Sequence, residues 1–292
     1  MAEALQRFFD GDVWHSFRAS PMAIGAALVA LVCLVCALGA DWIAPHNPFD
    51  LASLELADAR LPPAWDDEGK ARYLLGTDDQ GRDILSALMY GARISLFVGV
   101  VSVLLSAVVG VGLGLLSGFA GGKTDAFIMR VCDVMLSFPP ILIALLIDGV
   151  GRALFPNAHD TLAFAVLILA ISLSGWVQYA RTVRGSTMVE RNKEYVQAAR
   201  VIGVAPSRIM LRHVLPNVMG PVLVLATIQV ATAILTEATL SFLGVGVPPT
   251  RPSLGTLIRV GNDFLFSGEW WITIFPGLVL VMIALSVNLL GD

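Results

Sequence analysis

The sequence predicts an all-α integral membrane protein with six transmembrane helices. Of its 292 residues, 56% are hydrophobic and only 14% are charged, whereas charged residues make up about 25% of an average soluble domain. A helix needs roughly 20 predominantly apolar residues to cross a bilayer. Six stretches meet that requirement, and they are 22–41, 94–118, 127–150, 162–180, 220–244 and 271–290.

The first stretch follows Arg7 and Arg18, so a cleaved signal peptide is the alternative to a retained helix. Its apolar core is longer than that of the usual signal peptide, and five more spans follow it. We therefore expect an N-terminal segment at 1–21, a retained helix at 22–41, and an outer loop at 42–93 that is rich in Asp and Glu.

The second stretch carries a small residue at every fourth position. These residues are Ser102, Ser106, Gly110, Gly114 and Gly118. On a helix this spacing makes a flat ridge, along which another helix can approach closely. Packing inside the same subunit and an interface with another subunit are both compatible with such a ridge.

The third stretch contains two adjacent prolines, Pro139 and Pro140, which must interrupt its hydrogen bonds and bend it. Bent helices line pathways in transporters, so both prolines are candidates for a translocation path, although bent helices also occur in passive bundles. Asp133 lies three residues after Arg130. This spacing places the two on one helix face and predicts a local ion pair.

Glu237 lies deep in the fifth stretch, where an ionisable residue is a functional candidate by default. It has no oppositely charged neighbour in the sequence, and Thr232, Thr236 and Thr239 surround it. We expect Glu237 to face protein or a water-filled path rather than lipid. A contact with a transported substrate and a structural hydrogen-bonding role both remain open.

The connector between the fourth and fifth stretches decides the orientation, because cytoplasmic loops are enriched in Lys and Arg. It contains seven of the chain's 19 basic residues, which are Arg181, Arg184, Arg191, Lys193, Arg200, Arg208 and Arg212. The connector is therefore expected in the cytoplasm. With six spans, both termini are expected there as well.

Several classes of protein are disfavoured by the residues present. With a net charge of −4, the chain lacks the strongly basic balance that would point to nucleic acid. The three cysteines lie in apolar runs, and the four histidines lack the spacing of metal ligands. The segment SGFAGGKT is one residue too short before its Gly-Lys-Thr to be a nucleotide-binding P-loop. We expect no catalytic residue, metal or cofactor in this chain, and so no enzyme activity of its own.

Within the basic connector, one face of a short helix is predicted to be small or apolar. The residues of that face are Tyr195, Ala198, Ala199 and Ile202. Gly203 is a natural end for this helix and Pro206 a natural start for a second, which Leu215 and Pro216 are expected to end. The resulting elbow suits either a docking surface for a partner or an amphipathic hairpin that holds two spans apart.

The segment QAARVIGVAPSRIMLRHVLP, at 197–216, resembles the cytoplasmic EAA loop of ABC-importer permease subunits. The residues that carry the match are Ala198, Ala199, Gly203, Leu215 and Pro216. Gln197 stands where glutamate is usual, and His213 stands where isoleucine is usual.

Four more segments resemble the dipeptide/oligopeptide/nickel branch of these permeases. They are LLGTDDQGRDILSALMYGARISL (74–96), MRVCDVMLSFPPILIALL (129–146), EATLSFLGVGVPPTRPSLGTLI (237–258) and FPGLVLVMIALSVNLLGD (275–292). The likeness runs over nearly the whole chain from about residue 20, and it is nearest to the second permease subunit of dipeptide transporters.

This resemblance implies the type I ABC importer permease fold, with a five-helix core at 94–292 and a cytoplasmic coupling loop at about 185–217. In such importers a separate ATPase subunit holds the loop in a surface cleft. The implied docking face is Tyr195, Ala198, Ala199, Ile202 and Gly203, with Arg200 and Glu194 at its rim and Leu215 and Pro216 completing the motif.

The resemblance also implies the partners and the place of action. The partners are a homologous second permease subunit, two ATP-binding subunits that hold ATP and Mg²⁺, and a periplasmic or extracellular binding protein that meets residues 45–91 and 246–270. The lipid is that of the bacterial inner membrane. Short peptides are the expected substrate, while nickel chelates, opines, glutathione and peptide antibiotics stay open because the same family carries them. A stand-alone channel or carrier is less favoured, since no inverted repeat or mid-membrane charge cluster is found.

Overall fold

The computed structural model describes residues 17–50, 54–154, 159–247 and 251–291. Over these residues the secondary structure is helical, apart from one isolated β-bridge between Thr77 and Asp83. Five of the described helices are long and apolar enough to cross a membrane, and a helix pair bent by 88° makes a sixth span if it counts as one. The expected all-α membrane fold is confirmed, while residues 1–16 of the expected segment 1–21 lie outside the described residues.

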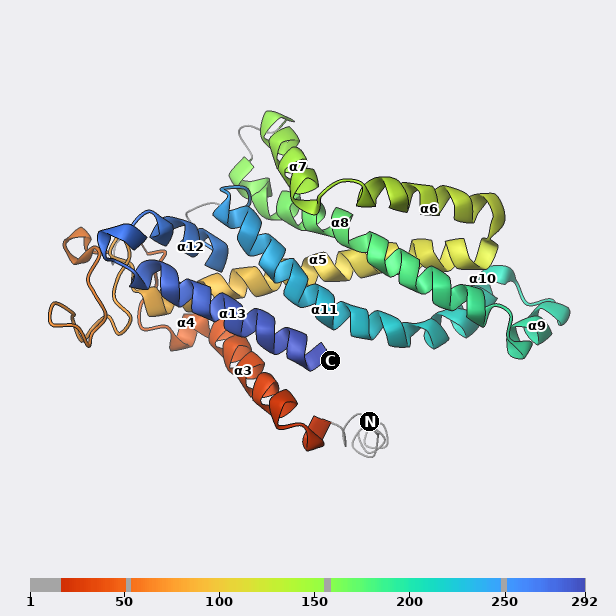
Figure 1. The fold of residues 1–292 in the computed structure, drawn as a ribbon, viewed down its shortest axis with the longest axis horizontal. Coiled ribbons are helices and arrows are strands. Elements are labelled where there is room, and N and C mark those ends of the chain that lie inside the picture. The colour runs from red at the N-terminus through yellow and green to blue at the C-terminus, as the bar shows by residue number, and fades with distance from the viewer. Residues whose placement is uncertain (1–16, 51–53, 155–158, 248–250, 292) are drawn as a thin grey trace. The chain divides into compact units, whose positions relative to one another are not determined.

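The chain forms two compact units (Figure 1). Unit 1 contains the residues up to Ile94 together with Thr250–Asp292, and unit 2 is Ser95–Pro249. One helix, α5 (Ile84–Ala120), starts in unit 1 and continues in unit 2. Unit 1 thus groups the outer segment with the C-terminal helices, which were expected to belong to the core.

In its described residues, unit 1 holds four α-helices besides the start of α5. They are α3 (Pro21–Leu38), α4 (Ala40–Ile43), α12 (Leu254–Asn262) and α13 (Trp271–Gly291). Helix α3 begins where its sequence favours it. The Ser20 hydroxyl accepts a hydrogen bond from the Ala23 N–H at 3.3 Å, and Pro21 occupies the first turn, where a missing N–H costs little. Helices α3 and α12 both pack against α13.

Arg93, in the first part of α5, binds the end of α3. Its Nε donates to the Ala37 carbonyl at 2.7 Å, and its Nη2 donates to the Leu38 carbonyl at 3.1 Å. Its Nη1 lies 3.1 Å from a carboxylate oxygen of Asp41. The last carbonyls of a helix have no partner within the helix, so a guanidinium group is a favourable partner for them. This explains how a charged residue is accommodated within α5.

The outer segment of unit 1 is held together by buried carboxylates. Asp58 accepts hydrogen bonds from Lys70 and, at 3.0 Å, from the Tyr73 hydroxyl. The Lys70 ammonium lowers the pKa of Asp58, whereas burial raises the pKa of the Tyr73 phenol. Asp78 pairs with Arg82 at 2.6 Å, and both side chains are buried. The segment is therefore a folded part of unit 1.

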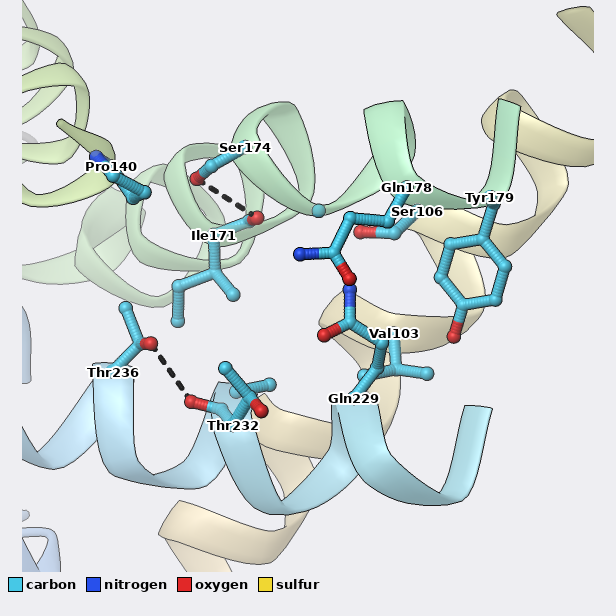
Figure 2. Close-up of a pocket in the computed structure, with 12 residues that line it drawn as sticks. Val103, Ser106, Pro140, Ile171, Ser174, Gln178, Tyr179, Gln229, Thr232 and Thr236 are labelled. Atoms are coloured by element: carbon cyan, nitrogen blue, oxygen red, sulfur yellow. Dashed lines mark hydrogen bonds between the residues drawn. The ribbon is translucent and has the colours of Figure 1, made fainter. Parts of the chain in front are cut away.

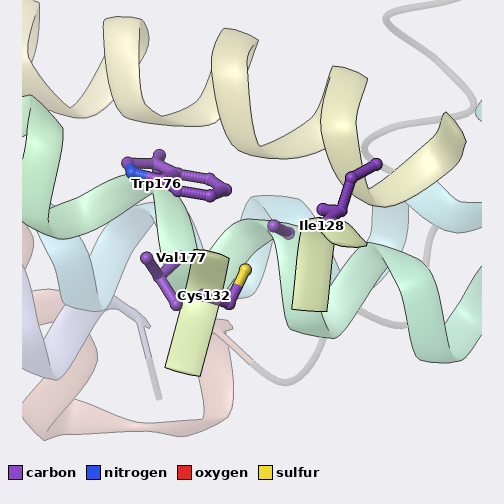
Figure 3. Packing of buried hydrophobic residues seen from close by; sticks show 5 residues of the cluster. Ile128, Cys132, Trp176 and Val177 are labelled. Carbon is purple, nitrogen blue, oxygen red and sulfur yellow. The ribbon is translucent and has the colours of Figure 1, made fainter. Parts of the chain in front are cut away.

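Unit 2 is organised around α8 (His159–Glu190). The other helices are α6 (Gly122–Leu136), α7 (Pro140–Leu154), α9 (Glu194–Val201), α10 (Pro206–Ile209) and α11 (Leu215–Phe242). Helix α8 packs against α6, α7 and α11. Its contact with α6 is a small core of Ile128, Cys132, Trp176, Val177 and Ala180 (Figure 3). Cys132 is thus a buried core residue, as its apolar surroundings in the sequence suggested.

The ridge of small residues on α5 faces α8 of the same subunit. A Cβ atom added at Gly110 would lie 2.3 Å from the Trp176 carbonyl oxygen, and one added at Gly114 would lie 2.4 Å from the Ala180 carbonyl oxygen. The helices also exchange hydrogen bonds, since Ser106 Oγ donates to the Ser172 carbonyl at 3.1 Å. Of the two interpretations of this ridge, packing inside the subunit is the one observed.

Several helices extend beyond the apolar stretches that predicted them. Helix α5 begins at Ile84 rather than at 94, and α8 continues to Glu190 rather than ending near 180. Hydropathy detects only the lipid-compatible part of a helix, whereas backbone hydrogen bonding continues through charged residues that find partners in the protein. Arg93 and Arg184 are such residues.

Candidate functional site

The predicted elbow is present between α8 and α11. Helix α9 ends in a C-terminal cap in which the Gly203 N–H donates to the Arg200 carbonyl at 3.0 Å and the Val204 N–H donates to the Ala199 carbonyl at 3.0 Å. This cap requires a left-handed residue, and Gly203 has φ of +79°. A Cβ at Gly203 would meet no atom within 4 Å, so the backbone conformation, and not space, calls for glycine.

The expected docking face of α9 is divided in the structure. Ala199 is only 7% exposed and Val196 is fully buried, so this side packs against the chain itself. Ala198 is exposed, and Val201 and Ile202 are 86% and 78% exposed. The side of α9 that a partner can reach is therefore Ala198, Val201 and Ile202. Val201 was absent from the predicted set, and Ala199 lies on the inner side because it follows Val196 by three residues.

Tyr195 ties α9 to both neighbouring helices. Its hydroxyl donates to a carboxylate oxygen of Glu190 at 2.5 Å and accepts from Asn217 Nδ2 at 3.1 Å. Burial and the Glu190 carboxylate raise the pKa of the Tyr195 phenol, which keeps its proton available for that bond. The ring remains partly exposed. Tyr195 thus combines an accessible ring with a hydroxyl group that fixes the elbow.

The two predicted rim residues differ in their surroundings. The Arg200 guanidinium lies 5.3 Å from the centre of the Phe119 ring, in the last turn of α5, a cation–π contact. Glu194 is exposed in the first turn of α9, where a negative charge is favourable to the helix dipole.

The prediction that Leu215 and Pro216 end the second short helix is wrong. Pro206–Phe242 runs as one helical span, in which α10 passes into α11 through a π-helical turn at Met210–Val214. Pro216 falls in the first turn of α11, directly after the turn in which the Leu215 N–H bonds to the Met210 carbonyl five residues back. The widened turn lets the helix pass a residue that lacks an N–H, so the proline marks a change of helix type.

Ion pairs connect α6 to α8 on the approach to the elbow. Arg184 donates to both carboxylate oxygens of Asp125, at 2.5 and 2.7 Å. Asp133 lies 2.5 Å from Arg181 of α8, which corrects the expected local pair with Arg130. The long-range partner was not visible in the sequence, because it lies 48 residues further along the chain.

A cavity of roughly 100 Å³, with a mostly apolar lining, lies within unit 2 between α5, α7, α8 and α11 (Figure 2). Its polar lining includes Gln178 and Tyr179 from α8 and Gln229, Thr232 and Thr236 from α11. None of the residues that line it is charged. Of the two candidate prolines, Pro140 lines this cavity, while Pro139 lies in the break between α6 and α7. The predicted bend at the prolines is confirmed as an 88° break.

Gln178, Tyr179 and Gln229 were not among the residues predicted inside the spans, because the candidates were an acidic residue and two prolines. The signal that could have found them is the presence of two glutamines within otherwise apolar stretches, at 162–180 and 220–244. Among the described residues, no group of three or more His, Cys, Asp or Glu side chains is gathered closely enough to hold a metal ion.

Glu237 is fully buried and faces protein, as expected. Ser95 Oγ donates to one of its carboxylate oxygens at 2.6 Å, and Ser241 Oγ donates to the other at 2.7 Å. It is not among the residues that line the cavity. The neighbouring threonines do not bind it: the hydroxyl groups of Thr232 and Thr236 donate to carbonyls of their own helix. A contact between Glu237 and substrate stays an untested prediction.

Comparison with protein families accounts for both ends of the chain. Residues 110–292 match the model of the binding-protein-dependent transport system inner membrane component. The chain belongs to this family. Residues 6–63 also match the N-terminal transmembrane domain of oligopeptide transport permease C. The chain is therefore a permease subunit of the ABC importer class, as the resemblance at 197–216 implied.

The permease is similar to curated relatives over almost its whole length. It is 40% identical to the di/tripeptide transport system permease protein DppC of Pseudomonas aeruginosa, over 96% of this chain and 88% of the relative. It is 41% identical to the dipeptide transport system permease protein DppC of Escherichia coli K12, over 96% of this chain and 89% of the relative.

The fold of the permease also has a counterpart among solved structures. A chain from the inward-facing MetNI methionine ABC transporter superimposes with a TM-score of 0.57 and 19% sequence identity, covering 70% of this chain and 93% of that one. The predicted type I ABC importer permease fold is confirmed.

Proposed function

We propose that this permease is one half of the translocation path of an ATP-driven importer of short peptides in the bacterial inner membrane. The observation that carries the proposal is the 40% identity to a di/tripeptide permease over 96% of the chain. Six spans are only half of the usual path in this class, so a homologous second permease subunit completes it. Both termini and the α9 elbow face the cytoplasm.

Energy for transport comes from two partner ATPase subunits, which bind ATP and Mg²⁺. The permease itself contributes binding and movement, and a binding protein outside the membrane delivers the peptide to the outer surface. The exposed apolar side of α9, with Ala198, Val201 and Ile202, is the proposed contact with an ATPase. The helix is held in place by the hydrogen bond from Tyr195 to Glu190. An exposed apolar patch on such a short cytoplasmic helix is suited to dock into a groove in a partner.

A reconstituted complex tests the proposed function. The chain is purified with its second permease, both ATPases and the binding protein, and placed in liposomes. ATP-dependent uptake of labelled Ala-Ala is expected, with none when the ATPases carry a substitution that abolishes hydrolysis. ATP-independent uptake by the chain alone would instead support a carrier.

The docking contact is tested by two neighbouring alanines that differ in burial. Ala198→Trp adds bulk on the exposed side of α9, so we expect the ATPases to dissociate and uptake to fall by at least about tenfold while insertion and thermal stability are kept. Ala199→Trp adds bulk against the chain itself and should lower thermal stability, because overpacking strains a filled site. Ala198→Ser, which stays small, is the control. Normal co-purification of the ATPases with Ala198→Trp would contradict the assignment.

A further inference from the structure

One buried hydroxyl group in the cavity has no partner. Tyr179 is fully buried in unit 2, and its hydroxyl oxygen has no hydrogen-bond partner among the described residues. Nearly all buried hydroxyl groups in folded proteins are hydrogen-bonded. Tyr179 also lines the cavity. The oxygen is closed to a water molecule in this structure, so a polar group that occupies the cavity during function reaches it only when the lining shifts.

The remaining lining indicates what kind of group that is. Gln178 and Gln229 approach from opposite walls, since α8 lies on one side of the cavity and α11 on the other (Figure 2). A carboxamide both donates and accepts hydrogen bonds, and so does the tyrosine hydroxyl. Gln229 is only 7% exposed, which makes its amide a fixed rather than a solvated group. In a lining that is otherwise mostly apolar, these two carboxamides are the groups that could pair with another amide.

The absence of charge in the lining excludes other parts of a peptide. A short peptide carries an ammonium group and a carboxylate at its ends, and each would lose its hydration without gaining an opposite charge in this cavity. The peptide bond is neutral, planar and has one donor and one acceptor. A volume of roughly 100 Å³ is sufficient for one such amide group or for a few water molecules.

We propose that this cavity binds the peptide bond of the transported peptide, with Gln178, Tyr179 and Gln229 as the contacting residues. The inference rests on the proposed function and adds to it a contact in the permease that senses the substrate directly. The charged ends, each two bonds from the peptide bond in a dipeptide, lie at the mouth of the cavity, where they keep their hydration. After the binding protein has selected a peptide, the permease thereby recognises its peptide bond in a second step.

The test compares Ala-Ala with Ala-N-methyl-Ala, in which the peptide bond has lost its N–H donor. Uptake of both labelled probes is measured in the reconstituted complex, and the ratio of their kcat/KM values is taken for each variant. Any preference of the binding protein for one probe is common to all variants, so a change in the ratio reports the permease. The wild type should prefer Ala-Ala, and Gln229→Leu should reduce the preference by about fivefold, the effect of one lost hydrogen bond.

Tyr179→Phe is the second variant, because it removes only the unsatisfied oxygen. A purely structural role predicts unchanged or improved transport and stability, since an unpaired buried hydroxyl group is removed. The inference predicts unchanged stability with a weaker uptake of Ala-Ala. Tyr90→Phe in unit 1 deletes a hydroxyl group that bonds to Asp41 and belongs to a residue outside the cavity lining, and it should leave the ratio unchanged.

Two results separate the failure of this inference from that of the proposed function. If the wild type takes up Ala-Ala but neither Gln229→Leu nor Tyr179→Phe changes the ratio, the cavity holds water and the inference fails alone. Equal wild-type uptake of both probes also overturns it. If the wild-type complex takes up neither probe, the proposed function fails first.

Discussion

At the scale of the residue, Glu237 shows how an acidic side chain is accommodated within the membrane. Its two oxygens accept hydrogen bonds from Ser95 of α5 and Ser241 of α11, and all three residues are at least 97% buried. The carboxyl group therefore joins two helices of unit 2. An acidic residue inside a membrane span is by default a candidate for function. The surroundings of Glu237 are instead those of a structural hydrogen-bonding group.

Substitutions at Glu237 should affect stability in a graded way. Glu237→Leu leaves two buried serine hydroxyl groups without this partner and should lower the free energy of unfolding by about 2 kcal/mol. Glu237→Gln keeps one acceptor and should cost under about 1 kcal/mol. Thr239→Val, exposed on the same helix, should stay within about 0.5 kcal/mol. Thermal unfolding in detergent measures all three. A stable Glu237→Leu protein with lost uptake would return Glu237 to the translocation path.

Asp58 predicts a pH dependence of the outer segment. The Lys70 ammonium lowers the pKa of Asp58 in the folded state, so its stabilising effect is complete above the ordinary aspartate range and is lost as pH falls through the lowered folded pKa. The stability difference between wild type and Asp58→Asn should be largest near neutral pH and shrink towards about pH 3. Unfolding followed by tryptophan fluorescence between about pH 3 and pH 7 checks this.

Asp79 provides a comparison of opposite sign in the same segment. Burial, followed by the nearby Asp78, raises the pKa of Asp79. Its charged form is therefore disfavoured in the folded state, and its contribution improves as pH falls. Asp79→Asn should make the protein more stable at neutral pH relative to wild type, with a difference that vanishes in acid. If the stability difference between wild type and Asp58→Asn were the same at every pH, the pairing of Asp58 with Lys70 would be contradicted.

At the scale of the element, the contact of α5 with α8 depends on the absence of side chains. Gly110 and Gly114 face backbone carbonyls of α8, whereas a Cβ atom added at Gly112, between them, would meet no atom within 4 Å. Gly110 and Gly114 therefore have a packing role, whereas Gly112 reflects only the general preference for glycine in membrane helices.

This alternation provides a matched pair of substitutions. In Gly114→Ala the new Cβ would lie 2.4 Å from the Ala180 carbonyl oxygen, so the helices must separate and the free energy of unfolding should fall by about 1–3 kcal/mol. Gly112→Ala should be neutral or slightly stabilising, because it only improves helix propensity. Thermal unfolding of the two variants decides. Equal effects would mean that α5 does not pack on α8 in this register.

The sequence predicts the elements that depend on local residues better than those that depend on contacts between distant parts of the chain. Five of the spans depend on local apolar composition and the end of α9 depends on one glycine, so these were found, whereas the third predicted span is a helix pair bent by 88°. The inner side of α9, the pairing of Asp133 with Arg181 and the cavity depend on residues brought together by folding over long sequence distances. The continuation through Pro216 was missed because a proline usually indicates a helix end, and the widened turn that accommodates it leaves no mark in composition.

At the scale of the whole molecule, the number of membrane crossings depends on the pair α6 and α7. Its 88° bend is compatible with one broken span or with a loop that returns to the side from which it started. Six crossings place both termini and the α9 elbow on one side. Five crossings place the elbow and the C-terminal end opposite the N-terminal end.

Cysteine labelling distinguishes the two topologies. In a background without the three native cysteines, we expect Arg18→Cys, Lys193→Cys and Gly291→Cys to react with an impermeant maleimide from the cytoplasmic side and Asp67→Cys from the outer side. Reaction of positions 193 and 291 from the outer side, with position 18 still cytoplasmic, would identify α6 and α7 as a re-entrant loop.

The helical run from Pro206 to Phe242 connects the elbow to the cavity. At 1.5 Å per residue, its 37 residues make a rod about 55 Å long. One end of the rod lies at the elbow, and Gln229, Thr232 and Thr236 of the cavity lie further along it. A force applied at the elbow therefore reaches the cavity wall through continuous helix, without a loop that would absorb it. In the proposed importer, a movement of the elbow and a change in the cavity wall are therefore motions of one helix.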